Sequence, residues 1–419
     1  MSGNRRAGGR TEIRLFILLV FALYVSQIFI VVPGTNLDSA NYGQYNTITL
    51  LGLSYSSWLS LIIICWCLLR IFFSLNRIRL TRPALLCTLA LLAFILVGAV
   101  NSSLSGLFDL GIKTVMPFVV FLYVRYVLVD LDSRSIDSLL LAVNLFLIGQ
   151  VLFCKVATGE FSANHYYTYI MDEEYFGYYN SPHPFTAMLG LLSIWNLRNI
   201  ALKQAPVLNV ALVAGNVALI VASGVRTYLL GLVFATVFLM VMALFRPELK
   251  RFRIFIIIAL FALVLLGGDL VAVLSGTRLS SSYNTTELSS GRFLRWTLDM
   301  GAYWSGNAYE ILFGGGFSHS YDVNSALIGV SINSLNFIVD LLLDNGVLGL
   351  VALITAYAGM LADLKRRGNG PFFVALLIYL LTGMFINNLL PYITVTLAAV
   401  LILVAWNRDG LSLQKGQTA

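Results

Sequence analysis

Long apolar runs recur along the whole chain, from Ile13 to Trp406, and they leave no stretch from which a separate soluble domain could be built. A helix that crosses the hydrocarbon core of a bilayer needs about 20 mostly apolar residues. Of the 419 residues, 58% are apolar and only 11% are charged, whereas soluble domains are about 25% charged. The sequence therefore predicts an all-α polytopic membrane protein that forms one integral membrane domain over 1–419.

About 12 segments are long and apolar enough to be membrane spans. The weakest is 111–129, where Lys113 and Arg125 lie near the two ends and can extend to the bilayer surface. The first span is expected to be retained, because its apolar run is too long for a signal peptide and no small-residue cleavage site follows. The predicted spans are 13–32, 50–73, 84–100, 111–129, 136–157, 184–199, 206–222, 227–245, 253–274, 334–361, 371–387 and 390–406.

Basic residues are concentrated in alternate loops of this predicted topology. Arg5, Arg6, Arg10 and Arg14 precede the first span, and Lys and Arg collect in short cytoplasmic loops. Four of the five loops predicted to be cytoplasmic are basic, which accounts for the net charge of +7 without a nucleic-acid partner. Both termini are therefore expected in the cytoplasm, and 275–333 is expected to be a large loop on the outer side.

Arg226 departs from this charge pattern, because it lies in a tight outer turn with apolar flanks, VASGVRTYLLGL. A charge at membrane depth costs about 2.5–3.5 kcal/mol on insertion scales. Such a residue usually has a partner or a task. The sequence allows two interpretations: Arg226 binds a functional ligand, or it forms a structural ion pair.

The large outer loop carries Arg278, Arg292 and Arg295. Arginine binds phosphate groups bidentately and stays charged when partly desolvated, so these residues suit an anionic ligand at headgroup level. Arg292 and Arg295 are three residues apart, which places both on one side of a helix. Under the alternative interpretation, they pair with acidic residues of the same loop, namely Glu287, Asp299 or Glu310.

A tyrosine-rich segment at 158–183 includes Tyr179 and His183. Aromatic side chains with polar neighbours suit sugar stacking, and they equally suit an aromatic belt at the bilayer surface. Asp340 and Asp344 are four residues apart on the tenth predicted span, so they share a face and should point into the bundle. Asp340, nearer the outer end, is the better candidate for substrate contact, and Asp344 is either structural or functional.

Neither a cofactor nor a metal is expected. The four cysteines lie inside predicted spans, without polar partners at metal-ligand spacing. The run Gly314-Gly315-Gly316 is not a phosphate-binding motif, because no strand precedes it and no Lys-Ser/Thr follows. It is expected to form a tight turn.

Four segments resemble motifs of the O-antigen polymerase and ligase superfamily. VASGVRTYLLGL resembles an S-x-R-T-x-L-L motif, and SSGRFLRW resembles S-G-R-x-x-x-W. ILFGGGF resembles L-x-G-x-G-x, and LNFIVDLLLDNGVLGL resembles the helix H-N-x-x-x-x-x-x-x-E-x-G-x-x-G-L. The motifs extend from about Gly177 to Leu350, and the rest of the chain is similar only in its hydropathy pattern.

One departure from these motifs bears on the activity. Leu335 stands where ligase-like members carry a histidine, while Asn336, Gly346 and Gly349 match and Asp344 replaces a glutamate. The departure favours a polymerase over a ligase. The family's proposed catalytic histidine is thus absent at this position, and His319 is a candidate to replace it.

The resemblance implies a metal-independent, C-type membrane glycosyltransferase in a bacterial inner membrane, with the large loop in the periplasm. Its substrates would be undecaprenyl-diphosphate-linked oligosaccharides, and a chain-length regulator and a flippase would be its protein partners. The expected catalytic residues are Arg226, Arg292, Asp340 and His319. The expected substrate-binding residues are Arg295, Arg278, Asn336, Tyr179 and His183. The alternatives are an O-antigen ligase-type transferase and a flippase or transporter of lipid-linked oligosaccharides.

Overall fold

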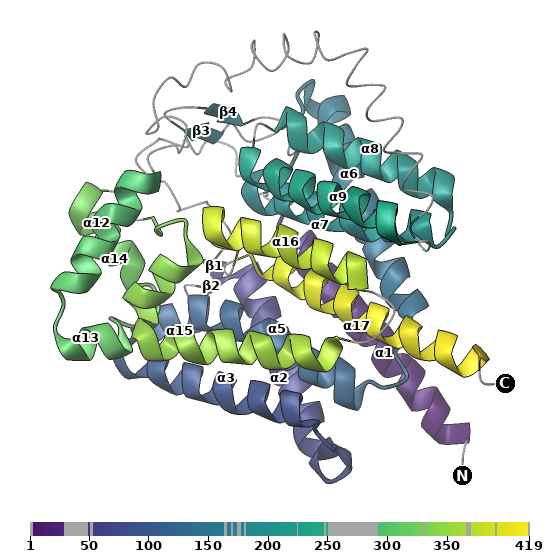
Figure 1. The fold of residues 1–419 in the computed structure, drawn as a ribbon, viewed down its shortest axis with the longest axis horizontal. Helices are drawn as coiled ribbons and strands as arrows, with labels where there is room; N and C mark the ends of the chain where they lie inside the picture. The colour runs from purple at the N-terminus through teal and green to yellow at the C-terminus, as the bar shows by residue number, and fades with distance from the viewer. Residues whose placement is uncertain are drawn as a thin grey trace.

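The structure is a computed structural model, and it is largely helical over the residues that it describes (Figure 1). Those residues are 3–28, 49–50, 53–162, 166–168, 171–173, 177–179, 182–223, 225–246, 249, 292–329, 332–365, 370–389 and 392–417. Two short antiparallel hairpins accompany the helices: β1 (Thr49–Leu50) pairs with β2 (Leu53–Ser54), and β3 (Tyr166–Thr168) pairs with β4 (Met171–Glu173).

The helices follow the apolar pattern of the sequence. The first half contains α1 (Gly3–Val25), α2 (Tyr55–Ser74), α3 (Arg82–Asn101), the short α4 (Leu104–Gly106), α5 (Ile112–Leu122) and α6 (Ser133–Thr158). A 3₁₀ turn at Leu75–Arg77 extends α2, and π-helical turns at Leu107–Gly111 and Tyr123–Val127 flank α5. The second half contains α7 (Pro182–Ala201), α8 (Pro206–Ala222), α9 (Arg226–Phe245), α12 (Arg292–Ser305), α13 (Ala308–Phe313), α14 (His319–Ile328), α15 (Phe337–Leu364), α16 (Gly370–Asn387) and α17 (Ile393–Gln417).

Each predicted span coincides with one of these helices, except 253–274, which lies outside the described residues. Among the described residues, six helices are long and apolar enough to cross a membrane. The prediction of an all-α, membrane-embedded protein is therefore confirmed. The six helices occupy Ser56–Arg77, Arg82–Asn101, Ser133–Thr158, Arg226–Phe245, Phe337–Leu364 and Gly370–Asn387.

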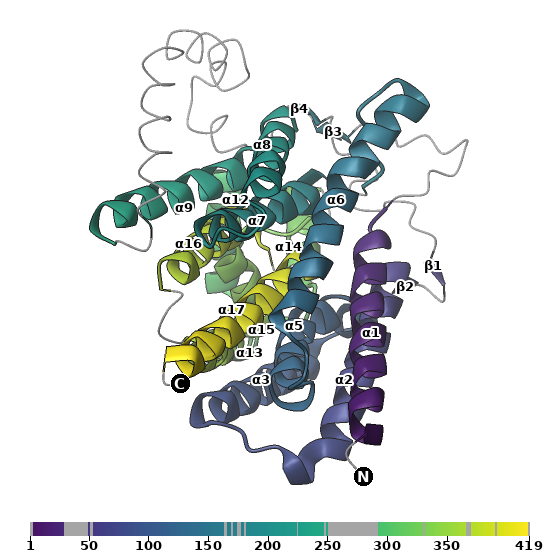
Figure 2. The same ribbon diagram turned by 90° about the vertical axis from the view of Figure 1, so that its right-hand side faces the viewer.

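The large outer loop predicted at 275–333 is helical where it is described. It forms α12, α13 and α14, which gather at one end of the molecule (Figure 1). The two chain termini lie toward the other end, and Figure 2, viewed from that end, places α12 and α14 behind the remaining helices. The loop and the termini are thus at opposite ends of the helix bundle.

Tyr379 fixes α16 between α7 and α9. Its hydroxyl donates a hydrogen bond of 2.6 Å to the Ala187 carbonyl in α7. Gly190 in α7 and Gly231 in α9 make room for the ring, because a Cβ atom would lie 2.3 Å from the Tyr379 hydroxyl at Gly190 and 3.2 Å from Cδ2 at Gly231. These close contacts hold the three helices side by side.

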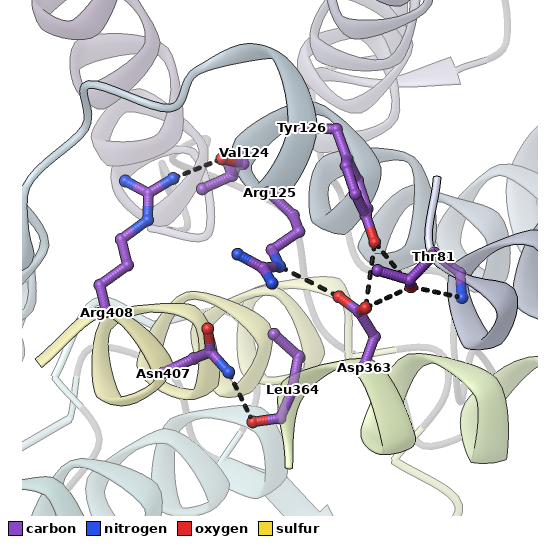
Figure 3. A network of polar contacts seen from close by, with 9 residues as sticks. Thr81, Val124, Arg125, Tyr126, Asp363, Leu364, Asn407 and Arg408 are labelled. Carbon is purple, nitrogen blue, oxygen red and sulfur yellow. Dashed lines mark hydrogen bonds and ion pairs between the residues drawn. The ribbon is translucent and has the colours of Figure 1, made fainter. Parts of the chain in front are cut away.

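A polar network joins four segments at the end that carries the C-terminus (Figure 3). Arg125 forms a 3.0 Å ion pair with Asp363 of α15, and Tyr126 and Thr81 also donate hydrogen bonds to that carboxylate, of 3.0 and 2.5 Å. Arg408 of α17 donates to the Val124 carbonyl at 2.6 Å. Arg125 was expected to extend to the bilayer surface, and it instead pairs with Asp363, a buried residue that the sequence did not connect to it.

The tenth predicted span is interrupted at Gly346, contrary to the continuous helix expected over 334–361. Gly346 has φ 63°, ψ −172° within α15. Just before this break, the carbonyls of Leu343 and Asp344 accept hydrogen bonds from the N–H groups of Gly315 and Gly316, at 2.8 and 2.7 Å. The glycine run therefore supplies donors to a broken helix, in addition to forming the expected turn.

Replacing Gly346 by alanine should destabilise the protein by about 2–5 kcal/mol, from overpacking and a left-handed backbone together. A Cβ atom at Gly346 would lie 2.4 Å from the Leu312 backbone. Gly301 in α12 provides the matched control, because a Cβ there has nothing within 4 Å. Gly301→Ala should be neutral or stabilising by up to about 1 kcal/mol. Thermal unfolding of both variants in detergent tests this, and equal melting temperatures would contradict it.

Candidate functional site

Two arginines predicted to act together meet at the start of α9. Arg226 is the first residue of α9, and the Val225 side chain before it makes no cap hydrogen bond. The guanidinium of Arg292, the first residue of α12, donates a 3.3 Å hydrogen bond to the Thr227 hydroxyl. The first N–H groups of a helix are positively polarised and lack intrahelical acceptors. Arg226, Arg292 and this helix end therefore concentrate positive charge in one place.

His183 lies beside this positive region, at the start of α7. Its Nδ1 is 3.1 Å from the Asn387 amide nitrogen at the end of α16, and Arg292 is close enough for its charge to act on the ring. The same amide donates 2.8 Å to the buried Tyr228 hydroxyl of α9. Three helix ends thus supply polar side chains to one small region.

The charged face of α12 is held against the segment that leads into α15. Arg295 donates to the Asn333 carbonyl at 3.4 Å, and Trp296 donates to the Ser334 carbonyl at 2.7 Å. Burial lowers the pKa of Arg295, and the charge of Asp299, one turn along, opposes that change. Burial likewise raises the pKa of Asp299. Of the acidic partners that the sequence suggested, Asp299 interacts with Arg295, Glu310 caps the start of α13, and Glu287 lies outside the described residues.

Asp340 lies 4% exposed in the first turn of α15, one helical turn beyond the cap residue Asn336. Its carboxylate accepts a 2.7 Å hydrogen bond from the Ser334 N–H and another from the Asn388 amide. Asn336 caps the helix through the N–H groups of Ile338 and Val339, and its amide donates 3.0 Å to the Phe385 carbonyl. Asn336 therefore joins α15 to α16 and positions the start of α15.

Asp340 and Asp344 line the same small cavity, as their four-residue spacing predicts. Asp344 accepts hydrogen bonds from the Ser320 and Ser318 N–H groups at 2.7 and 3.4 Å, so it caps the start of α14. Asn345, fully buried on the cavity wall, has no hydrogen-bond partner for either amide atom among the described residues. The cavity can therefore accept a polar group. Its lining also includes Leu110, Thr114, Phe317, Tyr321, Asn333, Leu341 and Asn388.

Leu335 has a left-handed backbone conformation, with φ 58°. This conformation is strained for a leucine, and such strain is often found at functional sites. Leu335 stands at the position where the resembling ligases carry a histidine, directly before the cap residue Asn336. The backbone at Leu335 therefore has an unusual geometry directly before the start of α15.

The remaining predicted site residues lie apart from this cluster or outside the described residues. Tyr179 is fully buried and packs against Phe185, with ring centroids 5.6 Å apart, so it belongs to the core. The His319 ring packs over the Gly315 backbone at the start of α14 and does not line the cavity with Asp340 and Asp344. Arg278 lies outside the described residues.

Two side-chain amides at the end of α16, those of Asn387 and Asn388, were not predicted as site residues from the sequence. Asn387 contacts His183 and Tyr228, and Asn388 contacts Asp340, so this pair links the arginine region to the cavity. A signal was present, because two adjacent asparagines end an apolar span, and polar residues there usually face the bundle interior.

Compared with known proteins, the chain matches no protein-family model, and no curated protein matches it.

Proposed function

We propose that this protein is a membrane glycosyltransferase that polymerises oligosaccharide repeat units carried on undecaprenyl diphosphate, at the periplasmic face of a bacterial inner membrane. The observation that supports this proposal is the hydrogen bond of 3.3 Å from Arg292 to Thr227, which brings Arg292 to the start of α9, at the residue that follows Arg226 in the chain. Such a site suits an anionic phosphate group.

In the proposed reaction, a hydroxyl oxygen of the acceptor sugar forms a bond to the anomeric carbon of the donor. The bond from that carbon to the lipid diphosphate breaks, and the diphosphate leaves with the electron pair. Arg226, Arg292 and the first N–H groups of α9 stabilise the charge that grows on the leaving group. Their contribution is greatest in a water-poor site, where charge interactions are less screened.

The acceptor hydroxyl must also lose a proton, and Asp340 is the candidate base. It lines the polar cavity, and Asn388 and Ser334 hold its carboxylate in place. General bases of this kind contribute about 10²–10⁴-fold to a rate. Two membrane-held substrates that meet in a fixed orientation gain further from proximity.

The distribution of charge favours a transferase over a transporter. The arginine region, Asp299, Asp340 and Asp344 lie at the end of the bundle formed by α12–α14. A passage for a lipid-linked glycan would need charged residues lining both halves of the bundle. The network at the opposite end contains an internal ion pair, Arg125 with Asp363, which joins the helices there.

The glycan profile of a deletion strain tests the proposal. Loss of a polymerase should leave single repeat units on the cell surface, because one unit can still be transferred to the final acceptor. Long chains stranded on the lipid carrier would indicate a lost ligase and would refute polymerase activity. Single lipid-linked units retained on the cytoplasmic leaflet would indicate a lost flippase and would refute the transferase proposal altogether.

A further inference from the structure

The outward face of α12 is apolar. Phe293 is 61% exposed, Leu294 is 59% exposed and Trp304 is 64% exposed. With 3.6 residues per turn, the exposed positions form one side of the helix, and none of them is charged. These positions are Phe293, Leu294, Thr297, Leu298, Gly301, Trp304 and Ser305.

The charged residues of α12 are on its inward face. Asp299 is fully buried, Arg292 donates to Thr227, and Arg295 donates to the Asn333 carbonyl. A helix on a water-exposed surface has the opposite arrangement, with polar residues outward and apolar residues toward the core. The orientation of α12 therefore indicates an apolar environment outside it.

The position of α12 identifies that environment. The helix lies at the end of the bundle and runs across the direction of α15 (Figure 1). The Arg292–Thr227 hydrogen bond ties it to the start of α9, whose outward residues Leu230, Val233 and Phe234 are 40–49% exposed and suited to lipid. The apolar face of α12 thus continues the surface of a spanning helix. Tryptophan, here Trp304, is enriched at the boundary between the lipid headgroups and the acyl chains.

We propose that α12 lies in the bilayer surface, with its apolar face in the lipid and its arginines turned toward the protein. Amphipathic helices bind a bilayer surface in this way, with the apolar face at the boundary of headgroups and acyl chains. This assignment does not depend on the proposed glycosyl transfer. It adds a direct lipid contact to the sequence expectation that 275–333 is a large outer loop with its arginines at headgroup level. It also lets a lipid-borne anion reach Arg292 and Arg295 from the side, without crossing water.

Spin labels on single cysteines test the assignment in lipid vesicles. The four native cysteines are first replaced by alanine, and labels are placed at Leu294 on α12, at Val237 on α9 and at Ser325 on α14. Oxygen dissolves preferentially in the bilayer, so frequent collision of a label with oxygen indicates that the label lies in lipid. A water-soluble nickel chelate stays outside the bilayer, so frequent collision with it indicates that the label lies in water. The Leu294 label should match the lipid reference at Val237, with a several-fold higher ratio of oxygen to nickel accessibility than the label at Ser325.

A Leu294 label as accessible to nickel as the Ser325 label would overturn the assignment. Leu298, on the same face and 38% exposed, carries a second label in case the Leu294 variant does not fold, and it should give the same ratio. Because no readout involves glycan, a negative result here leaves the proposed function standing, and a failed glycan profile leaves the lipid contact standing.

Discussion

Replacing Arg292 by alanine should reduce the rate of polymer formation by about 10²–10³-fold, the effect expected when one preorganised donor to a developing negative charge is removed. Arg292 is chosen because its guanidinium reaches the first turn of α9, where it donates 3.3 Å to Thr227 beside Arg226. Arg226→Ala should have an effect of similar size. The measurement is the chain length and amount of polymer made by purified protein in vesicles, from a defined lipid-linked repeat unit.

Two further variants distinguish the effect of losing an arginine at the proposed site from the effect of losing any positive charge. Arg246→Ala removes an exposed arginine from the far end of the same helix, α9, and should leave polymer formation unchanged. Arg292→Lys keeps the charge but loses the planar, bidentate donor geometry, so its activity should lie between wild type and Arg292→Ala. Normal chain length in Arg292→Ala, with the protein present in the membrane, would remove the proposed mechanism.

Most of the helices follow directly from apolar patterning, because a bilayer forces backbone polar groups into helical hydrogen bonds. The break in α15 was not predicted, since Gly346 lies in a segment that is apolar enough overall to form one span, although Asp344 and Asn345 stand directly before it. Its donors, Gly315 and Gly316, are about 30 residues earlier in the chain, and only the folded arrangement brings them to the break. A contact between residues so far apart in the chain produces no local sequence pattern that could predict it.

The candidate site divides in the same way. Arg226 and Arg292 were each predicted as catalytic residues, and the shared face of Asp340 and Asp344 was predicted from their spacing. Asp299, which interacts with Arg295 from the next turn of α12, was among the acidic partners that the sequence suggested. Asn388, which reaches Asp340 from α16, was not predicted. Such partners depend on helix packing, which single-sequence periodicity does not specify.

Asp340→Asn should lower the rate of chain elongation by about 10²–10⁴-fold, the usual contribution of a general base. The asparagine has nearly the same shape and can still accept the Ser334 N–H bond of 2.7 Å, and the Asn388 amide can turn over so that its oxygen accepts from the new amide nitrogen. The asparagine cannot accept a proton. Substrate binding should change little, so the loss should fall on kcat and leave KM near its wild-type value. Steady-state elongation kinetics in vesicles measure both constants.

Asp344→Asn is the matched comparison on the same helix face. Asp344 accepts the Ser320 and Ser318 N–H groups and so holds the start of α14, which makes its role structural. In the Asp344→Asn side chain, one of the two carboxylate oxygens is replaced by an NH₂ group, which would face the N–H of Ser318 or Ser320 and could not accept its hydrogen bond. The variant should therefore lose about 1–3 kcal/mol of stability, with a smaller change in kcat than Asp340→Asn. If Asp340→Asn elongates at the wild-type rate, Asp340 is not the base. In that case His319→Ala becomes the informative variant, because His319 is the candidate to replace the missing histidine and it begins α14, whose Ser320 and Tyr321 line the cavity.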